Sequence, residues 1–101
     1  MEKRQYIHAI NLLAKGVEDE FPLVKAQNLD YYFKGVLTPE QMAGHLKAMI
    51  PKMRGFLDGD RLSKLNRWLG YAQGFANAAG IFSLNGLREM NIPPEETFIK
   101  K

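Results

Sequence analysis

Apolar residues recur at intervals of three and four positions along most of this 101-residue chain, and that spacing constrains the fold more than any other feature. Because an α-helix has about 3.6 residues per turn, such spacing gathers apolar side chains into one stripe along a helix. The alternation of apolar and polar residues that is typical of a half-buried strand does not occur. The sequence therefore predicts an all-α fold, a compact bundle of four to five helices in a single domain. The predicted helical domain spans 1–90, and 91–101 form a C-terminal exit segment.

Two helices are predicted in the first third of the chain. The apolar stripe of the first comprises Tyr6, Ile10, Leu13 and Val17. This helix should end before Pro22, because proline disfavours helical geometry at the residue that precedes it. A weaker apolar pattern predicts a second helix over 23–36, with Gly35 near its end.

The third predicted helix has a clear start. Thr38 can serve as the N-cap, Pro39 occupies the first helical position, and Gln41 completes the spacing of a capping box. The apolar stripe of this helix comprises Met42, Leu46, Met49 and Met53. We expect Pro51 to kink or break the helix, because its ring removes one backbone donor. A turn rich in glycine and aspartate follows over 55–60.

The fourth predicted helix is the most strongly specified element. Asp60 is its expected N-cap, because a carboxylate is favourable at the positive end of a helix. The apolar stripe of this helix comprises Leu62, Leu65, Leu69, Ala72, Ala76 and Ala79. Gly80 is expected to end the helix in the left-handed conformation, with Ile81 packing back in a Schellman motif.

A short fifth helix is predicted over 84–90. Ser83 is its expected N-cap, and Phe82 and Leu87 have the spacing of a hydrophobic staple. Beyond this helix, two consecutive prolines should hold the start of the exit segment extended.

Two glycines, Gly70 and Gly74, stand in the middle of the fourth predicted helix. Each lowers helix stability by about 1 kcal/mol relative to alanine, so a close approach to this side of the helix is expected. One interpretation is tight packing against the first or third helix, with the nearby amides capping a neighbouring turn. The other is a groove for a partner, bordered by basic side chains. The predicted partner-binding residues are Lys64, Asn66, Arg67, Gly70, Tyr71, Gln73, Gly74 and Asn77.

Basic residues concentrate in the stretch 47–67, where six positive charges minus two negative charges leave a surplus of four, compared with +3 for the whole chain. These residues are Lys47, Lys52, Arg54, Arg61, Lys64 and Arg67. With Trp68 and Tyr71 nearby, they could bind phosphates while a base stacks on an aromatic ring. They could also steer the chain onto an acidic patch of another protein. A solvated basic face, with Trp68 in the core, is the third interpretation.

The sequence contains none of the familiar catalytic or metal-binding patterns. It has no cysteine, its two histidines, His8 and His45, lie on different predicted helices, and no phosphate-binding or nucleophile motif occurs. We therefore predict a protein that is not an enzyme and that uses no cofactor or metal. No signal peptide and no run of about 20 apolar residues is present, which predicts a cytoplasmic protein without membrane contact.

The segments "LNRWLGYAQG" and "GIFSLNGLREMN" resemble a pattern found in small proteins of tailed bacteriophages and prophages. That pattern is N-[KR]-W-L-G-[FY]-x-Q-G, followed by G-[IV]-[FY]-[ST]-[LI]-x-x-L-R. The matching residues are Asn66, Arg67, Trp68, Leu69, Gly70, Tyr71, Gln73, Gly74, Gly80, Ile81, Phe82, Ser83, Leu84, Leu87 and Arg88. One departure is Gly86, which stands where those proteins often have an acidic residue. The resemblance implies a phage origin and the host cytoplasm, and it implies no activity.

These observations together predict a small phage-encoded accessory protein that binds a host protein or protein complex. Inhibition of a host defence or regulatory complex, such as CRISPR machinery, would be a role of this kind. A nucleic-acid-binding module that uses the basic stretch 47–67 is one alternative. A structural homo-oligomer, in which the small-residue face packs against its own copy, is the other.

Overall fold

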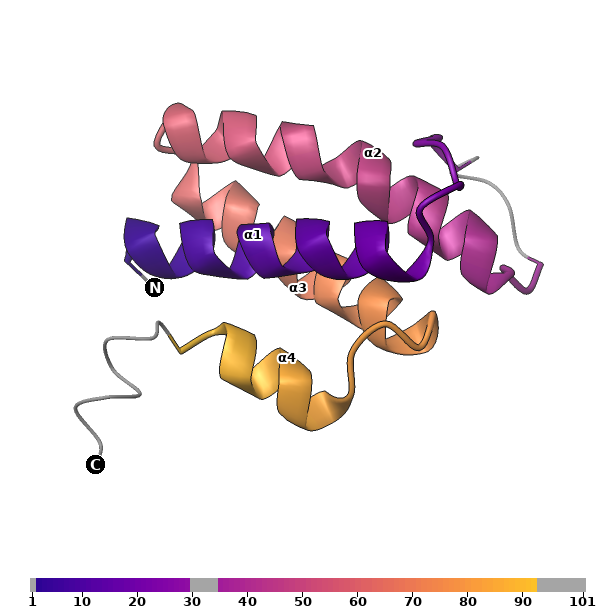
Figure 1. Cartoon of the computed structure of the whole chain (residues 1–101). Helices are drawn as coiled ribbons and strands as arrows, with labels where there is room; N and C mark the ends of the chain where they lie inside the picture. Colours follow the sequence, from indigo (N-terminus) through magenta and orange to yellow (C-terminus); the bar gives the residue numbers. More distant parts are fainter. Residues whose placement is uncertain (1, 30–34, 93–101) are drawn as a thin grey trace.

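The computed structural model describes residues 2–29 and 35–92, and all regular secondary structure in these residues is helical (Figure 1). The helices are α1 (Lys3–Glu20), α2 (Pro39–Asp58), α3 (Leu62–Ala78) and the short α4 (Leu84–Met90). Successive helices run in opposite directions, and α4 lies along the side of α1 and α3 that is away from α2 (Figure 1). The predicted all-α fold is therefore confirmed.

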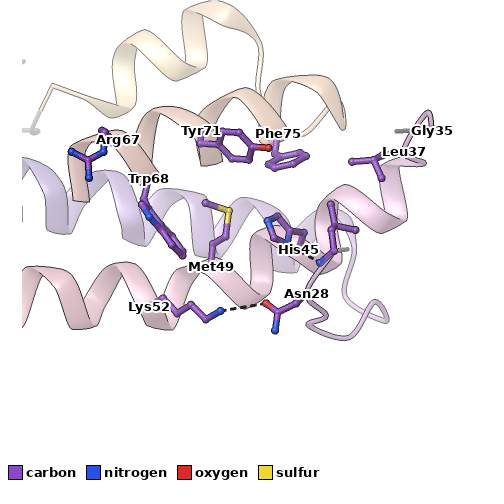
Figure 2. A pocket seen from close by; sticks show the side chains of 11 residues that line it. Asn28, Gly35, Leu37, His45, Met49, Lys52, Arg67, Trp68, Tyr71 and Phe75 are labelled. Carbon is purple, nitrogen blue, oxygen red and sulfur yellow. Dashed lines mark hydrogen bonds between the residues drawn. The ribbon is translucent and has the colours of Figure 1, made fainter. Parts of the chain in front are cut away.

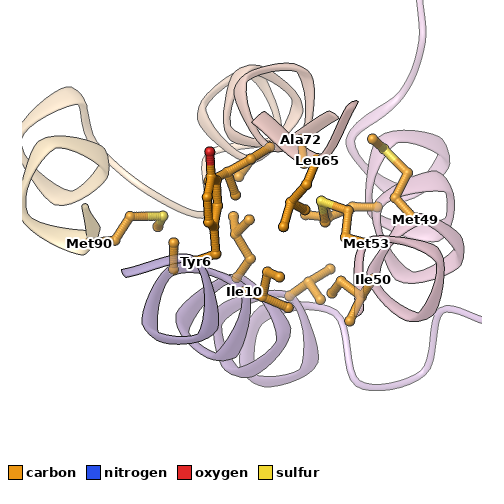
Figure 3. Close-up of a cluster of buried hydrophobic side chains, with 14 of the residues drawn as sticks. Tyr6, Ile10, Met49, Ile50, Met53, Leu65, Ala72 and Met90 are labelled. Atoms are coloured by element: carbon orange, nitrogen blue, oxygen red, sulfur yellow. The ribbon is translucent and has the colours of Figure 1, made fainter. Parts of the chain in front are cut away.

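The hydrophobic core lies between α1, α2 and α3, and α4 adds Met90 at its edge (Figure 3). Every fully buried side chain among the described residues is apolar or aromatic. The buried set is Tyr6, Ala9, Ile10, Leu13, Val17, Ala43, Leu46, Met49, Ile50, Met53, Leu65, Leu69, Ala72, Ala76 and Met90. The whole predicted stripe of the first helix belongs to this set. Helical spacing therefore identified the faces that are removed from water.

Two predicted helix starts are confirmed by their hydrogen bonds. At α2, the Gln41 backbone N–H donates to the Thr38 hydroxyl at 3.1 Å, and the Thr38 N–H donates to the Gln41 side chain at 2.9 Å. At α4, the Gly86 N–H donates to the Ser83 hydroxyl at 3.0 Å. Each cap satisfies a backbone donor that the helix itself leaves without a partner.

The predicted end of α3 is also confirmed. Gly80 adopts the left-handed conformation with φ of 79°. The Gly80 N–H donates to the Asn77 carbonyl at 3.0 Å, and the Ile81 N–H donates to the Ala76 carbonyl at 2.9 Å. This pair of bonds is a Schellman motif.

Pro51 does not break α2, which continues from Pro39 to Asp58. The ring removes only the hydrogen bond that its nitrogen would have donated to the Lys47 carbonyl. Ile50 and Met53, on either side of the proline, are both buried in the core. The prediction of a break was wrong because tertiary packing of the apolar face outweighs one missing hydrogen bond.

Asp60 ends α2 and is not the N-cap of α3. Its φ is 58°, a left-handed conformation that aspartate tolerates better than most residues. The Asp60 N–H donates to the Leu57 carbonyl at 3.2 Å, and the Arg61 N–H donates to the Phe56 carbonyl at 2.8 Å, so α2 also ends in a Schellman arrangement. The Asp60 carboxylate forms an ion pair with Lys3, and the residue before α3 is Arg61, which makes no side-chain cap.

Of the predicted helix over 23–36, the structure describes residues 23–29 and 35–36, and these residues are not helical. The backbone of this segment finds its partners in α2. The Gln27 N–H donates to the Gly44 carbonyl at 3.0 Å, and the Leu29 N–H donates to Nδ1 of His45 at 3.3 Å. Residues 30–34, and the exit segment from residue 93 onward, lie outside the described residues.

Candidate binding surface on α3

The amide side chains of α3 make hydrogen bonds within the chain. Asn66 accepts a hydrogen bond from the Tyr6 hydroxyl at 3.2 Å. The Gln73 amide donates to the Asn91 side chain at 2.9 Å, and the Asn77 amide donates to the Phe82 carbonyl at 3.0 Å. These contacts join α3 to α1 and to the two ends of α4. Of the three amides, only Asn77 caps a neighbouring turn through a backbone carbonyl, whereas Asn66 and Gln73 bond to other side chains.

The two central glycines of α3 face open space. A Cβ atom added at Gly70 or Gly74 would have no neighbour within 4 Å among the described residues, and both glycines are exposed. At Gly16 of α1, by contrast, a Cβ would lie 2.5 Å from the Phe82 ring, and at Gly44 of α2 it would lie 3.0 Å from Gln27. The chain thus uses glycine for close packing elsewhere. Tight packing within the monomer was the wrong interpretation of the α3 glycines.

An exposed strip runs along the outer side of α3, and we call it the open strip. It consists of Arg67, Gly70, Tyr71, Gly74 and Ala78. Tyr71 is 63% exposed, which is high for a large aromatic residue. Of the predicted partner-binding residues, Arg67, Gly70, Tyr71 and Gly74 thus share one accessible surface. Lys64 lies beside Phe56 at the edge that faces α2.

A pocket of about 460 Å³ lies beside the open strip, between α2, α3 and the segment that precedes α2 (Figure 2). The residues that line it are Asn28, Leu29, Gly35, Leu37, His45, Met49, Lys52, Arg67, Trp68, Tyr71 and Phe75. Arg67, Trp68, Tyr71 and Phe75 of α3 face His45, Met49 and Lys52 of α2 in Figure 2. The sequence does not predict this pocket, because Asn28, Leu29 and Gly35 fall within the predicted helix 23–36.

Aromatic rings line much of the pocket and contact one another by their edges. The Tyr71 and Phe75 rings are 4.9 Å apart at an angle of 75°, and the Phe75 and His45 rings are 5.3 Å apart at 69°. Trp68 is half-buried and meets Phe56 of α2 at 5.0 Å and 80°. Edge-to-face contacts of this kind are favourable and hold the rings in defined orientations.

Two of the six clustered basic residues belong to the packing of α2. The Lys47 side chain is only 12% exposed, and its ammonium donates to the Phe21 and Val24 carbonyls at 2.7 Å each. It also lies 3.3 Å from the Glu18 carboxylate. Arg54 donates to the Asn11 side chain of α1 at 2.9 Å. Neither residue lies on the pocket side, so the basic stretch does not form one continuous face.

The other four basic residues are Lys52 and Arg67 in the pocket lining and Arg61 and Lys64 at the Phe56 ring, and we call them the basic rim. Lys52 and Arg67 line the pocket itself. The Lys64 ammonium lies 4.8 Å from the centre of the Phe56 ring, and the Arg61 guanidinium lies 5.5 Å from it. Within residues 2–29 and 35–92, no carboxylate pairs with any member of the basic rim. The rim therefore makes this side of the molecule electropositive.

The surroundings of His45 in the pocket wall favour its neutral form. Burial lowers the pKa of His45 below its ordinary value of 6.5, the charge of Lys52 lowers it further, and the backbone of Gln27 acts in the opposite direction. The Leu29 N–H donates to Nδ1, which requires that this nitrogen carry no proton. The other ring nitrogen is then the one that carries hydrogen.

We expect the free energy of unfolding to fall as the pH drops from about 7 to about 5, partly through His45. The folded-state pKa of His45 lies below its unfolded value, so the unfolded chain takes up this proton first. The stabilising contribution is complete above the unfolded pKa and is lost as the pH falls toward the folded pKa. Urea denaturation of the wild type and of His45→Gln across this range checks this, and the variant should lose less stability. Parallel pH profiles for the two proteins would contradict the assignment.

Among the described residues, no group of three or more histidine, aspartate or glutamate side chains is placed to hold a metal ion. No helix in that part of the chain is long and apolar enough to cross a membrane. No family model matches the chain, and no curated protein or solved structure does so either.

Proposed function

We propose that this chain is a small accessory protein of phage origin that binds a host protein through the open strip of α3 and catalyses no reaction. One observation carries the proposal: Gly70 and Gly74 are exposed in the middle of a helix, and no residue in the described part of the chain requires a glycine there. Both also belong to the motif that resembles phage proteins. Inhibition of a host defence or regulatory complex is the role that this context favours.

The helix stability that is lost at Gly70 and Gly74 supports a role for them in binding rather than in folding. Alanine at either position would favour the helix by about 1 kcal/mol, and no described residue would obstruct its methyl group. A glycine leaves the helix backbone open to close approach by another surface. Arg67 and Tyr71 border the glycines, and arginine and tyrosine are the residue types enriched at the energetic centres of protein interfaces. A partner lying flat against α3 would account for all four residues.

The substitution Gly70→Ala/Gly74→Ala is expected to raise the free energy of unfolding by about 2 kcal/mol. Urea denaturation followed by circular dichroism measures this. Gly55→Ala is the matched control, because Gly55 is also an open helical glycine but lies on α2, away from the open strip. It should stabilise by up to about 1 kcal/mol. A loss of stability in the α3 variant would show that the glycines serve the fold.

The binding role is tested with longer side chains at the same positions. Wild type, Gly55→Ala and Gly70→Gln/Gly74→Gln are used to capture proteins from host lysate, with and without nuclease. We expect a host protein that the first two recover in the presence of nuclease and that the glutamine variant loses while it remains folded. Equal recovery by all three would remove the open strip as the binding surface. A wild-type mass that rises with concentration, and that the glutamine variant does not show, would favour the homo-oligomer instead.

A further inference from the structure

We propose that the pocket and its basic rim bind single-stranded nucleic acid, with a base held against the pocket aromatics and phosphates on the rim. This goes beyond the proposed function, because it assigns a second ligand to the pocket beside the open strip, with which the pocket shares Arg67 and Tyr71. The juxtaposition that points to it is Tyr71 and Trp68 in one pocket with Lys52 and Arg67, beside Lys64 of the rim.

The charge of the site selects an anionic ligand. Among the described residues that line the pocket, the charged ones are Lys52 and Arg67, and both are positive. Arg61 and Lys64 extend the positive charge along α3 past Phe56. Since no described carboxylate neutralises any of the four, a chain of phosphates would gain these contacts without first breaking an ion pair.

The aromatic content of the site selects a ligand with flat rings. The Tyr71 side chain is 63% exposed, so its ring is accessible from solvent. Trp68 and Phe75 line the same cavity. Bases of any sequence can stack on such rings, and cationic grooves with stacking aromatics are the usual means by which proteins hold single strands. An acidic peptide would satisfy the rim but would make less use of the rings.

Polar groups in the pocket are placed to contact the edge of a base. The Asn28 side-chain oxygen accepts a hydrogen bond from Lys52 at 3.4 Å, which leaves its amide hydrogens available (Figure 2). His45, whose Nδ1 accepts the Leu29 N–H, also lines the pocket. Small-ligand pockets typically combine apolar walls with a few convergent groups of this kind.

The size of the pocket favours a single strand over a duplex. A cavity of about 460 Å³ falls in the range that encloses a small ligand, which includes one nucleotide. In a duplex the bases are paired and stacked, and proteins read them by placing a helix or a ribbon in a groove. A base can enter this pocket only from a strand in which it is free to turn outward.

The test uses a fluorescently labelled oligo(dT) strand of about twelve nucleotides. Binding is followed by anisotropy and by the emission of Trp68, which is the only tryptophan in the chain and lines the pocket. We expect saturable quenching of Trp68, and binding at least about tenfold tighter than that of a duplex of equal length at about 50 mM salt. If all four rim charges contact phosphates, a plot of the logarithm of the binding constant against the logarithm of salt concentration should have a slope of about −3.

Three variants of the full chain separate the contribution of the rim charges to binding from those of net charge and of base stacking on Tyr71. Lys52→Gln/Arg67→Gln should weaken binding by more than about tenfold and bring the salt slope to about −1.5. Lys15→Gln/Arg88→Gln removes the same charge from exposed positions on α1 and α4 and should stay within about twofold of the wild type. Tyr71→Ala should weaken binding by between about fivefold and a hundredfold without changing the salt slope.

Several outcomes would overturn the proposal. One is the absence of binding to oligo(dT) at low salt by protein that circular dichroism shows to be folded. Others are equal weakening by the two charge variants, binding unaffected by Tyr71→Ala, or tighter binding of the duplex. Equal quenching of Trp68 by a polyglutamate peptide of matched charge would also overturn it, because charge alone would then explain the effect.

Discussion

Leu46→Ala is expected to lower the free energy of unfolding by about 2–5 kcal/mol. Leu46 lies near the middle of α2, is 0% exposed, and belongs to the core that α2 shares with α1 and α3. The substitution loses the transfer energy of the removed methyl and methylene groups, and it leaves a cavity that the helices can only partly fill. Domains of this size have a total stability of about 5–15 kcal/mol, so much of the population could unfold. Urea denaturation followed by helical circular dichroism measures the change.

Leu84→Ala is the control for Leu46→Ala, because the same atoms are removed from a side chain that is 73% exposed at the start of α4. Its effect should stay within about 0.5 kcal/mol. If Leu46→Ala were equally mild, or Leu84→Ala equally severe, the assignment of the core to the α1–α2–α3 interface would be wrong.

Lys47→Met is expected to lower the free energy of unfolding by about 1.5–3 kcal/mol. The ammonium bonds to the carbonyls of Phe21 and Val24, and it lies near Glu18, so it fastens the chain that leaves α1 onto α2. Methionine preserves the apolar stem but cannot donate, and the carbonyls then lose a charged partner in a half-buried place. Thermal and urea denaturation both report this loss.

Lys52→Met tests whether the loss of stability in Lys47→Met comes from the contacts of Lys47 or would follow the replacement of any lysine of α2. Lys52 is exposed and makes one long hydrogen bond, at 3.4 Å to Asn28. Its replacement should change stability by no more than about 0.5 kcal/mol. Equal losses in the two variants would mean that Lys47 contributes only through net charge.

Local sequence signals predicted helix ends well, and the reason is physical. The hydrogen bonds of the Thr38 capping box, the Ser83 cap and the Gly80 Schellman motif all join residues within five positions of one another. All the information for such a motif is therefore present in a short segment. Asp60 was misassigned because aspartate suits both a helix start and a left-handed residue, and nothing local decides between them.

Features that depend on distant partners could not be predicted. The segment 23–29 has apolar spacing typical of a helix, yet its hydrogen bonds reach Gly44, His45 and Lys47 of α2. The pocket depends on the same arrangement, because residues from this segment form part of its wall. No spacing rule within 23–36 contains these long-range contacts.

The candidate site was predicted in its elements but not in its arrangement. Sequence reasoning identified the α3 glycines, the aromatics and the basic residues of 47–67. It could not separate Lys47 and Arg54, which contact the α1 side, from Lys52 and Arg67, which line the pocket, because neighbours in sequence can lie on opposite sides of a helix. It also could not decide which neighbour the glycines would meet.

The separation of α3 into a buried face, a face of amide contacts and the open strip has a consequence for how such a protein can diversify. Substitutions at sites without shared contacts have nearly additive effects on stability. A Cβ atom added at Gly70 or Gly74 would contact no described residue, and Ala78 is exposed beside them. Mutations accumulating there are therefore uncoupled from those in the core. A lineage could vary the residues of the open strip while inheriting its scaffold unchanged.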